Sequence, residues 1–327
     1  MSTDRRQLAP FIHTDKSAPY IYLTLLVSLI PCAVCGIFYY GVRAFILILF
    51  CMTAFVLSDN LCARITKRRS GGDYFDFSSL VEGLLLALLL PPDTTLITAL
   101  FAVLFASVIT KQVFGGVGSN IINPACAGRL FIELVYPSMT RGFSYGEDNS
   151  RLSVISLVIQ GDPAATPDLS HFSFAELISG NYPGMIGTSC MICILIGGVF
   201  LTLKGSMRLY SPVSYVLTLL ALYPVSMVIA EGQFSFDGML IYILSSGVLF
   251  VAVFLLGDLT TMPSRFAAGV FAGAVCGILT IVTKPFLSPM VSVLSPVLAV
   301  NFLSFVLDFF SKTLSRRKIR SREVDIS

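Results

Sequence analysis

Charged residues, histidine and tryptophan are scarce in this sequence. Only 13% of the residues are charged, tryptophan is absent, and the two histidines are His13 and His171. A soluble domain carries about 25% charged residues, so the composition excludes an ordinary soluble protein. Two histidines in separate polar segments also argue against a haem with two histidine ligands and against a Ser-His-Asp hydrolase. Tyrosine and phenylalanine must supply any aromatic belt at a membrane interface.

Apolar residues dominate instead, at 55% of the chain, with a mean hydropathy of +0.83. They form long blocks rather than amphipathic periods, which predicts an all-α polytopic membrane protein. Two of the blocks, 77–90 and 121–136, are too short to cross a bilayer alone as helices. The ten expected segments are 20–40, 44–62, 77–90, 95–113, 121–136, 185–203, 211–230, 238–256, 266–283 and 286–309.

The basic residues indicate an orientation. With the N-terminus in the cytoplasm and each segment crossing once, 17 of the 22 basic residues fall on the cytoplasmic side, as the positive-inside rule predicts. Lys111 is among them, assigned to an inner loop. Both termini are therefore expected in the cytoplasm, and the polar stretch 137–184 outside.

The expected segments divide into two sets of five around that outer stretch. Since five is odd, the two sets have opposite topology, which is typical of transporters built from inverted repeats with broken helices. The predicted organisation is a tail and first repeat at 1–136, an extracytoplasmic loop at 137–184, a second repeat at 185–310 and a basic cytoplasmic tail at 311–327. The stretch "FLLGDLTTMPSRF" (254–266) interrupts the second set with Asp, Thr-Thr and Pro.

Ionisable residues within membrane segments are costly and are candidates for function. Glu82 lies in the middle of the third segment without a partner nearby in sequence. Arg129 and Glu133 are spaced i, i+4 and can neutralise each other on one helix face. Asp258 and Asp59 lie near segment ends, where capping a helix is the alternative to a functional role.

The segment "GGVGSNIINPACAGR" (115–129) is rich in glycine and carries two asparagines and a proline. Pro124 leaves a carbonyl unpaired in any helix that it enters, and Asn120 and Asn123 can satisfy such a group or bind a ligand. The segment does not match a phosphate-binding glycine motif. It predicts a re-entrant turn.

Two of the expected helices each carry a Cys-x-x-Cys pair, Cys32/Cys35 and Cys190/Cys193. Residues i and i+3 of a helix face the same way, so the pairs could converge on an iron–sulfur cluster. Cysteine is also a common small apolar residue of helices, and this interpretation is favoured. No metal site is therefore predicted.

Thr166 stands in the outer loop within "PAATP". The simplest interpretation is that its hydroxyl caps a turn. Its alanine neighbours nevertheless leave the hydroxyl sterically open, and Pro167 favours an extended backbone at Thr166. A modifying enzyme could reach this side chain.

Five motifs, "GLLLALLLPP", "KQVFGGVGSNIINPACAGR", the "AATP" loop, "GNYPGMIGTSCMICILIGG" and "LGDLTTMPS", give the chain a resemblance to a known family. From about Pro10 to Phe310 it resembles the D subunits of the Rnf electron-transport complex, which are homologous to the B subunit of the sodium-pumping NADH:quinone reductase. The resemblance implies two inverted five-helix halves, as in urea channels. It also implies FMN attached by a phosphoester to a threonine in a Ser-Gly-Ala-Thr motif, whose counterpart here is Pro163-Ala164-Ala165-Thr166.

The resemblance further implies a subunit, inactive alone, that relays electrons in a ferredoxin:NAD oxidoreductase coupled to sodium or proton translocation. Its expected partners are other Rnf-type membrane and peripheral subunits, a flavin transferase and membrane lipid, but not nucleic acid, in the cell membrane of a bacterium or archaeon. A noncovalent flavin such as riboflavin is expected beside Gly115, Gly116, Asn120 and Asn123, and an ion pathway along Glu82, Asp258, Thr260 and Thr261. A urea-channel-like solute channel without redox activity is the alternative.

Overall fold

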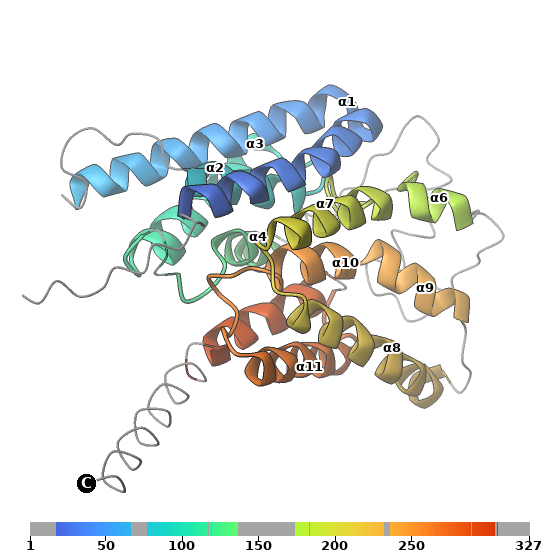
Figure 1. Ribbon diagram of the computed structural model, residues 1–327. Helices are drawn as coiled ribbons and strands as arrows, with labels where there is room; N and C mark the ends of the chain where they lie inside the picture. The colour runs from blue at the N-terminus through green and yellow to red at the C-terminus, as the bar shows by residue number, and fades with distance from the viewer. Residues whose placement is uncertain are drawn as a thin grey trace, which may run out of the picture.

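The computed structural model of this 327-residue chain describes residues 18–66, 77–116, 118, 120–136, 174–182, 184–231, 236–288, 290–304 and 306. Within these ranges all regular structure is helical, which confirms the predicted all-α class (Figure 1). The helices are α1 (Ala18–Ile65), α2 (Phe77–Leu88), α3 (Leu96–Leu104), the π-helix η1 (Phe105–Gln112), α4 (Pro124–Val135), α6 (Phe174–Ser179), α7 (Met191–Lys204), α8 (Tyr210–Glu231), α9 (Phe236–Ser245), α10 (Val248–Phe250), the π-helix η3 (Val251–Leu255) and α11 (Phe266–Thr283). An apolar helix, Met290–Ser304, follows α11.

Helix α1 consists of two apolar helices joined at Gly41. The backbone there has φ 69° and ψ −151°, outside the helical region. A positive φ carries little steric penalty for glycine because it has no Cβ. Figure 1 shows the chain reversing direction at this turn. The predicted segments 20–40 and 44–62 are therefore confirmed, with Gly41 between them.

Helix α2 is short, as predicted. Its 12 residues extend about 18 Å, less than the thickness of the hydrocarbon layer. The helix ends just before Pro91 and Pro92, which lack the N–H group that a continuing helix needs. The chain then turns into α3, where the Thr95 side chain caps the helix by accepting a hydrogen bond from the Thr98 N–H.

The loop 184–190 completes the end of α2, and it corrects the predicted segment 185–203. The N–H of Gly187 donates to the Leu88 carbonyl at 2.8 Å, and the N–H of Ile186 donates to the Leu90 carbonyl at 3.2 Å. These residues therefore satisfy carbonyls that α2 leaves without helical partners. Helix α7 begins only at Met191 because the preceding backbone is used in this way.

The predicted segment 238–256 is not a continuous helix. It is broken around Ser246 and Gly247, and the helical pieces on either side are bent by 53°. Gly247 has φ 79°, a conformation that stops the first helix. Near the end of the second piece the helix winds as the π-helix η3.

Among the residues that the structure describes, three helices are long and apolar enough to cross a membrane: Ala18–Ile65, Tyr210–Ile229 and Phe266–Thr283. The bent pair makes a fourth if it counts as one span. Four more apolar helices are shorter: Phe77–Leu88, Leu96–Gln112, Met191–Lys204 and Met290–Ser304. Large apolar side chains are exposed along many of these helices, which is expected of a surface that faces lipid. A multi-helical membrane protein is therefore supported, and the ten-segment arrangement stays a prediction.

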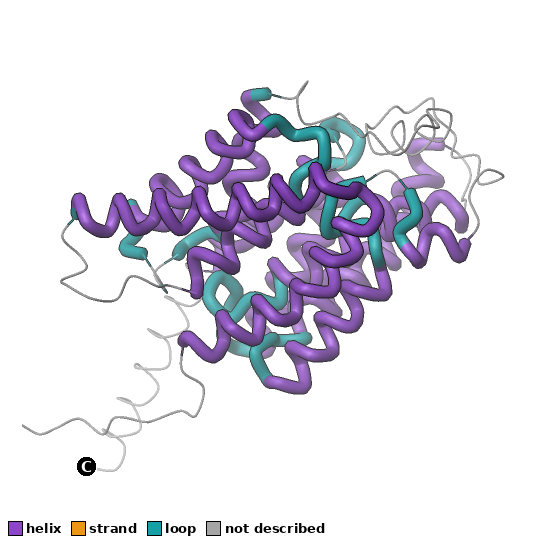
Figure 2. Tube along the Cα trace, turned by 90° about the horizontal axis from the view of Figure 1, so that it is seen from above, coloured by secondary structure: helices purple, strands orange, loops and turns teal. Residues whose placement is uncertain are grey.

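The core contains loops as well as helices. In the view from above (Figure 2), loop segments lie among the helices and not only at their outer ends. Residues 84–90 at the end of α2 are all buried, and so is the loop 184–190 that bonds to them. Non-helical backbone is tolerated at membrane depth where protein covers it and its hydrogen bonds are made.

Helices α8 and α11 pack closely because glycine repeats every fourth residue on α11. Gly269, Gly273 and Gly277 all face α8. A Cβ added at Gly273 would lie 2.3 Å from the carbonyl oxygen of Ser211. Small residues at this spacing allow helix backbones to approach each other within a membrane.

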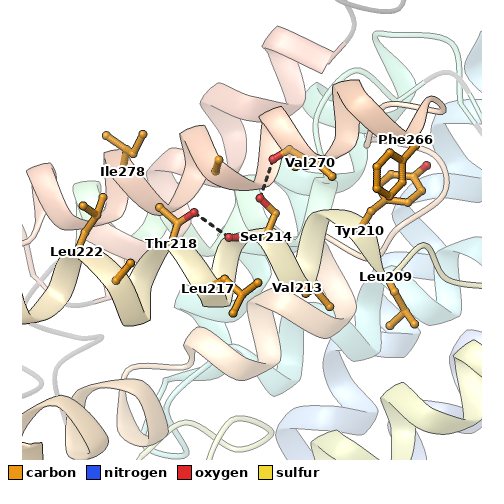
Figure 3. A pocket seen from close by; sticks show the side chains of 12 residues that line it. Leu209, Tyr210, Val213, Ser214, Leu217, Thr218, Leu222, Phe266, Val270 and Ile278 are labelled. Carbon is orange, nitrogen blue, oxygen red and sulfur yellow. Dashed lines mark hydrogen bonds between the residues drawn. The ribbon is translucent and has the colours of Figure 1, made fainter.

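An apolar groove of about 740 Å³ runs along the outer side of the same helix pair (Figure 3). The hydroxyl of Ser214 donates to the Val270 carbonyl at 2.7 Å, and that of Thr218 donates to the Ser214 carbonyl at 2.8 Å. Both hydroxyls therefore already donate a hydrogen bond to a backbone carbonyl. The groove presents an apolar surface of the kind that lipid chains cover, and the ionisable residues described below do not line it.

Candidate functional site

Glu82 is buried against the N-terminus of α4. Its Oε2 atom lies 3.4 Å from the backbone N–H of Ala125, which donates to it. Asn123 is the N-cap of α4 and accepts a hydrogen bond from the Cys126 N–H at 3.0 Å. The free N–H groups of a helix N-terminus carry partial positive charge, which stabilises a carboxylate there. The structure thus places Glu82 at the start of a short helix in the protein interior, and an ionisable residue within an apolar segment is a candidate for function.

Pro124 does not interrupt a helix, which corrects the sequence interpretation. It is the first residue of α4, where its missing N–H would have had no helical partner. Asn123 likewise is occupied by helix capping. The chain turns in the loop before α4, where Gly115, Gly116 and Gly118 all have positive φ, and the re-entrant character of this turn stays a prediction.

Sequence reasoning missed a buried ionic network on the other side of Glu82. The Lys111 Nζ lies 3.1 Å from Asp59 Oδ2, and both side chains are completely buried. The same ammonium donates to Ser78 Oγ at 2.6 Å and to Ser79 Oγ at 3.0 Å, so its three protons are all used. Asp59 accepts further hydrogen bonds from Ser79 and from the Gln112 amide. The network is fully connected, as a buried ion pair requires.

Lys111 therefore lies in a helix with its side chain buried, and not in a loop as assigned from the sequence. Lys111 and Gln112 are the last residues of the π-helix η1, and Thr110 is buried beside them. Three consecutive residues, Thr110, Lys111 and Gln112, are buried at this end of η1 because neighbouring helices surround it. A count of basic residues by position cannot detect this burial.

Asp59 does not cap an exposed helix end, because it is buried within this network. Glu82 interacts electrostatically with Asp59 and Lys111 from one side. Ser78 and Ser79 precede Glu82 by one helical turn, so all three share the face of α2 that meets these groups.

Asp258 also lies within electrostatic reach of Glu82. Its Oδ1 accepts from the Thr260 N–H at 3.1 Å, and its Oδ2 accepts from the hydroxyls of Thr260 at 2.6 Å and Thr261 at 3.0 Å. This is the geometry of a local turn closed by an aspartate side chain. The structure therefore brings the four expected pathway residues into one region, where Asp258 closes a local turn and does not cap a helix.

The pair Arg129–Glu133 is confirmed as self-neutralising. Arg129 Nη1 lies 2.5 Å from Glu133 Oε2, with both side chains buried. Arg129 Nε also donates to the carbonyl of Leu89, just beyond α2, at 2.9 Å. Ser288 donates to the other oxygen of Glu133 at 3.4 Å. The guanidinium thus joins α4 to the end of α2.

The residues expected to line a second flavin lie in or near the turn after η1, and their role stays a prediction. Gly115 and Gly116 lie in the turn after η1, and Asn123 is used as the cap of α4. Asn120 is buried, and its Oδ1 has no hydrogen-bond partner among the described residues. Asn120 is thus the residue of this set with an acceptor available to a ligand. Thr166, the expected attachment site, and most of the loop 137–184 lie outside the described residues.

These features define an all-helical membrane protein with short helices meeting in its interior and buried charges at their ends. The sequence matches the profile of the NQR2, RnfD, RnfE family over residues 6–315, and the chain belongs to this family.

Three proteins similar to this chain are all described as D subunits of ion-translocating oxidoreductase complexes. The D subunit of the Na(+)-translocating ferredoxin:NAD(+) oxidoreductase complex of Acetobacterium woodii is 25% identical over 279 residues, covering 84% of this chain and 83% of that protein. The D subunit of the ion-translocating oxidoreductase complex of Pectobacterium carotovorum is 25% identical over 93% of this chain and 96% of its own length. The corresponding protein of Salmonella typhi is 21% identical with the same coverage.

Proposed function

We propose that this chain is the D-type membrane subunit of an Rnf-type complex that couples electron transfer from ferredoxin to NAD with translocation of sodium ions or protons. The observation that carries the proposal is the family match over residues 6–315, together with relatives described as D subunits that align over most of their length. Its partners are then the other subunits of such a complex. Its location is the cell membrane of a bacterium or archaeon, with both termini in the cytoplasm.

The proposal includes two inverted five-helix halves. The two helices of α1 are followed by the short α2, by α3 continued in η1, and by the short α4. In the second half α7 and α8 are followed by the broken pair α9–η3, by α11, and by the short helix Met290–Ser304. Each half thus has two apolar helices, a short or broken one, another apolar helix and a short one. The stretches "LLPPDTT" (89–95) and "LLGDLTT" (255–261) end the third element in both halves.

The redox role rests on FMN joined by a phosphoester to the hydroxyl of Thr166. When bound, a flavin accepts one or two electrons and so connects two-electron with one-electron carriers. The motif at 163–166 and the predicted outer location of the loop support this attachment, which a flavin transferase would carry out. A noncovalent flavin such as riboflavin would use the turn at Gly115 and Gly116, with Asn120 as its available hydrogen-bond acceptor.

Replacing Thr166 by alanine is expected to abolish covalent flavin. The measurement is in-gel flavin fluorescence of the denatured full-length chain, co-expressed with a flavin transferase, followed by intact-mass spectrometry. The wild type should fluoresce and carry one FMN adduct, whereas Thr166→Ala should be dark and unmodified because it lacks the ester-forming oxygen.

A nearby hydroxyl provides the matched control. Ser170→Ala, in the same loop, should keep the fluorescence of the wild type. An unmodified wild-type chain, with the transferase verified on another substrate, would contradict the redox proposal and favour the urea-channel-like solute channel.

The ion pathway is proposed to pass Glu82 in the first five-helix half and Asp258, Thr260 and Thr261 in the second half. Burial of the ionisable Glu82 side chain within an apolar segment supports it. In the assembled complex, Glu82→Gln is expected to reduce ion translocation toward background at matched electron flux, because the amide keeps the shape of the side chain and loses its charge. Vesicle uptake measured against NADH formation tests this.

Glu176→Gln, on the short helix α6, is the matched control and should leave the ratio of ions to electrons unchanged. A normal ratio in Glu82→Gln would remove Glu82 from the pathway and would leave the flavin proposal untouched.

A further inference from the structure

The two Cys-x-x-Cys pairs meet between the first helix of α1 and α7. The two helices are joined at both ends: the Thr24 hydroxyl lies 2.8 Å from Ser206 Oγ, and the Tyr40 hydroxyl lies 2.9 Å from Ser189 Oγ. Between these contacts, the sulfur atoms of Cys35, Cys190 and Cys193 all lie within 4.8 Å of one another. Cys35 is distant from the other two in the sequence, so only the fold brings the three together.

Cys32 supplies a fourth thiol to this cluster. It precedes Cys35 by three residues, so both lie on the same face of the helix. Its side chain is buried, and it interacts electrostatically with Cys190 and Cys193. All four are free thiols. The spacing that first suggested ordinary apolar packing therefore brings three sulfur atoms together, and Cys32 on the same helix face is the candidate for a fourth ligand.

The compactness of the group indicates the kind of ligand. A tetrahedral metal ion bound to thiolates at about 2.3 Å places neighbouring sulfur atoms about 3.8 Å apart. Three sulfur atoms already within 4.8 Å of one another match a single ion. An iron–sulfur cluster distributes its thiolates over two or more iron atoms and holds them farther apart. Thiolates select zinc or iron among the divalent ions, in tetrahedral geometry.

We propose that Cys32, Cys35, Cys190 and Cys193 bind one thiophilic divalent metal ion, zinc or iron, in a tetrathiolate site. Binding releases the four thiol protons and leaves a site with a net charge of −2, formed by four thiolates and one dication.

The fold provides partial compensation for that charge. Cys190 is the N-cap of α7, and the backbone N–H groups of Ile192 and Cys193 lie close to its sulfur. A helix N-terminus stabilises thiolate and lowers the cost of binding the metal. Cys35 and Cys193 are partly exposed, whereas Cys32 and Cys190 are buried. By the predicted topology, the site lies in the outer half of the bundle, below the Tyr40–Ser189 contact.

The experiment uses the full-length chain purified from a host grown with its natural metal supply. Metal content by mass spectrometry is expected to be one ion per chain. X-ray absorption at the metal edge should show four sulfur ligands at about 2.3 Å. Cys35→Ser and Cys190→Ser should each lose the ion, whereas Cys51→Ser and Cys276→Ser, which replace buried cysteines elsewhere in the bundle, should retain it. Gel filtration verifies that each variant is folded.

Zinc or iron with all-sulfur coordination supports the site, and iron would add a visible thiolate-to-iron absorption band when oxidised. A metal-free wild type, whether its four thiols are alkylated in the folded state or two of them form a disulfide, would overturn it. So would a metal with nitrogen or oxygen ligands, which the wild-type spectrum reveals even where a variant fails to fold. The same measurement on Thr166→Ala should give unchanged metal content, so this inference and the flavin proposal fail or hold separately.

Discussion

Replacing Lys111 by methionine is expected to lower the free energy of unfolding by about 3–5 kcal/mol. The ammonium donates to Asp59, Ser78 and Ser79, and neither charged side chain of the pair is exposed. Removing it leaves the Asp59 carboxylate buried without its counter-charge, and that uncompensated burial is the source of the cost. Denaturant unfolding in mixed micelles, followed by the reactivity of the buried Cys51 thiol, measures the change.

Two further variants show that the effect belongs to the ion pair. Lys204→Met makes the same substitution at an exposed position at the end of α7, and it should change stability by less than about 1 kcal/mol. The double variant Asp59→Leu/Lys111→Met should be more stable than Lys111→Met alone, because no unpaired charge remains. Equal destabilisation by the Lys111 and Lys204 substitutions would contradict the network.

Gly273→Leu is expected to destabilise the protein by about 3 kcal/mol, at the upper end of the range for overpacking. The obstacle is backbone: a Cβ at this position would lie 2.3 Å from the Ser211 carbonyl oxygen, and a carbonyl oxygen in α8 cannot move aside as a side chain can. Helices α8 and α11 must separate to admit the side chain. The thermal midpoint of the purified protein and its fraction of monodisperse material in gel filtration measure the effect.

The matched control is Ala267→Leu, which adds the same side-chain atoms on the exposed side of the first turn of α11. It should leave the thermal midpoint nearly unchanged, since the added leucine faces lipid or detergent. If Gly273→Leu behaved like this control, the close approach of the two helices would be wrong.

Local features of the sequence were enough to predict much of the helical fold. The apolar blocks located α8 and α11, and Pro91 and Pro92 indicated why α2 ends early. The start of α7 could not be predicted in the same way. Residues 185–190 are apolar enough for a helix, but N–H groups among them bond instead to the carbonyl groups at the end of α2, which is distant in sequence.

The candidate site was predictable where a residue is unusual for its surroundings. Glu82 was recognised because a carboxylate within an apolar block is costly. Lys111 was not, because it lies near the end of a segment, where a lysine commonly reaches water. Its burial depends on Asp59 and Ser78, which come from two other helices. Thr166 lies outside the described residues, and its role stays a prediction.

The guanidinium that joins α4 to Leu89 limits how the interior can rearrange. Two hydrogen bonds connect helices α2 and α4. Arg129 of α4 donates to the Leu89 carbonyl just beyond α2, and the Ala125 N–H of α4 donates to Glu82 of α2. Sliding either helix past the other would break both hydrogen bonds, although Arg129 would keep Glu133 as its counter-charge. The two short helices are therefore expected to move together in any rearrangement of the interior.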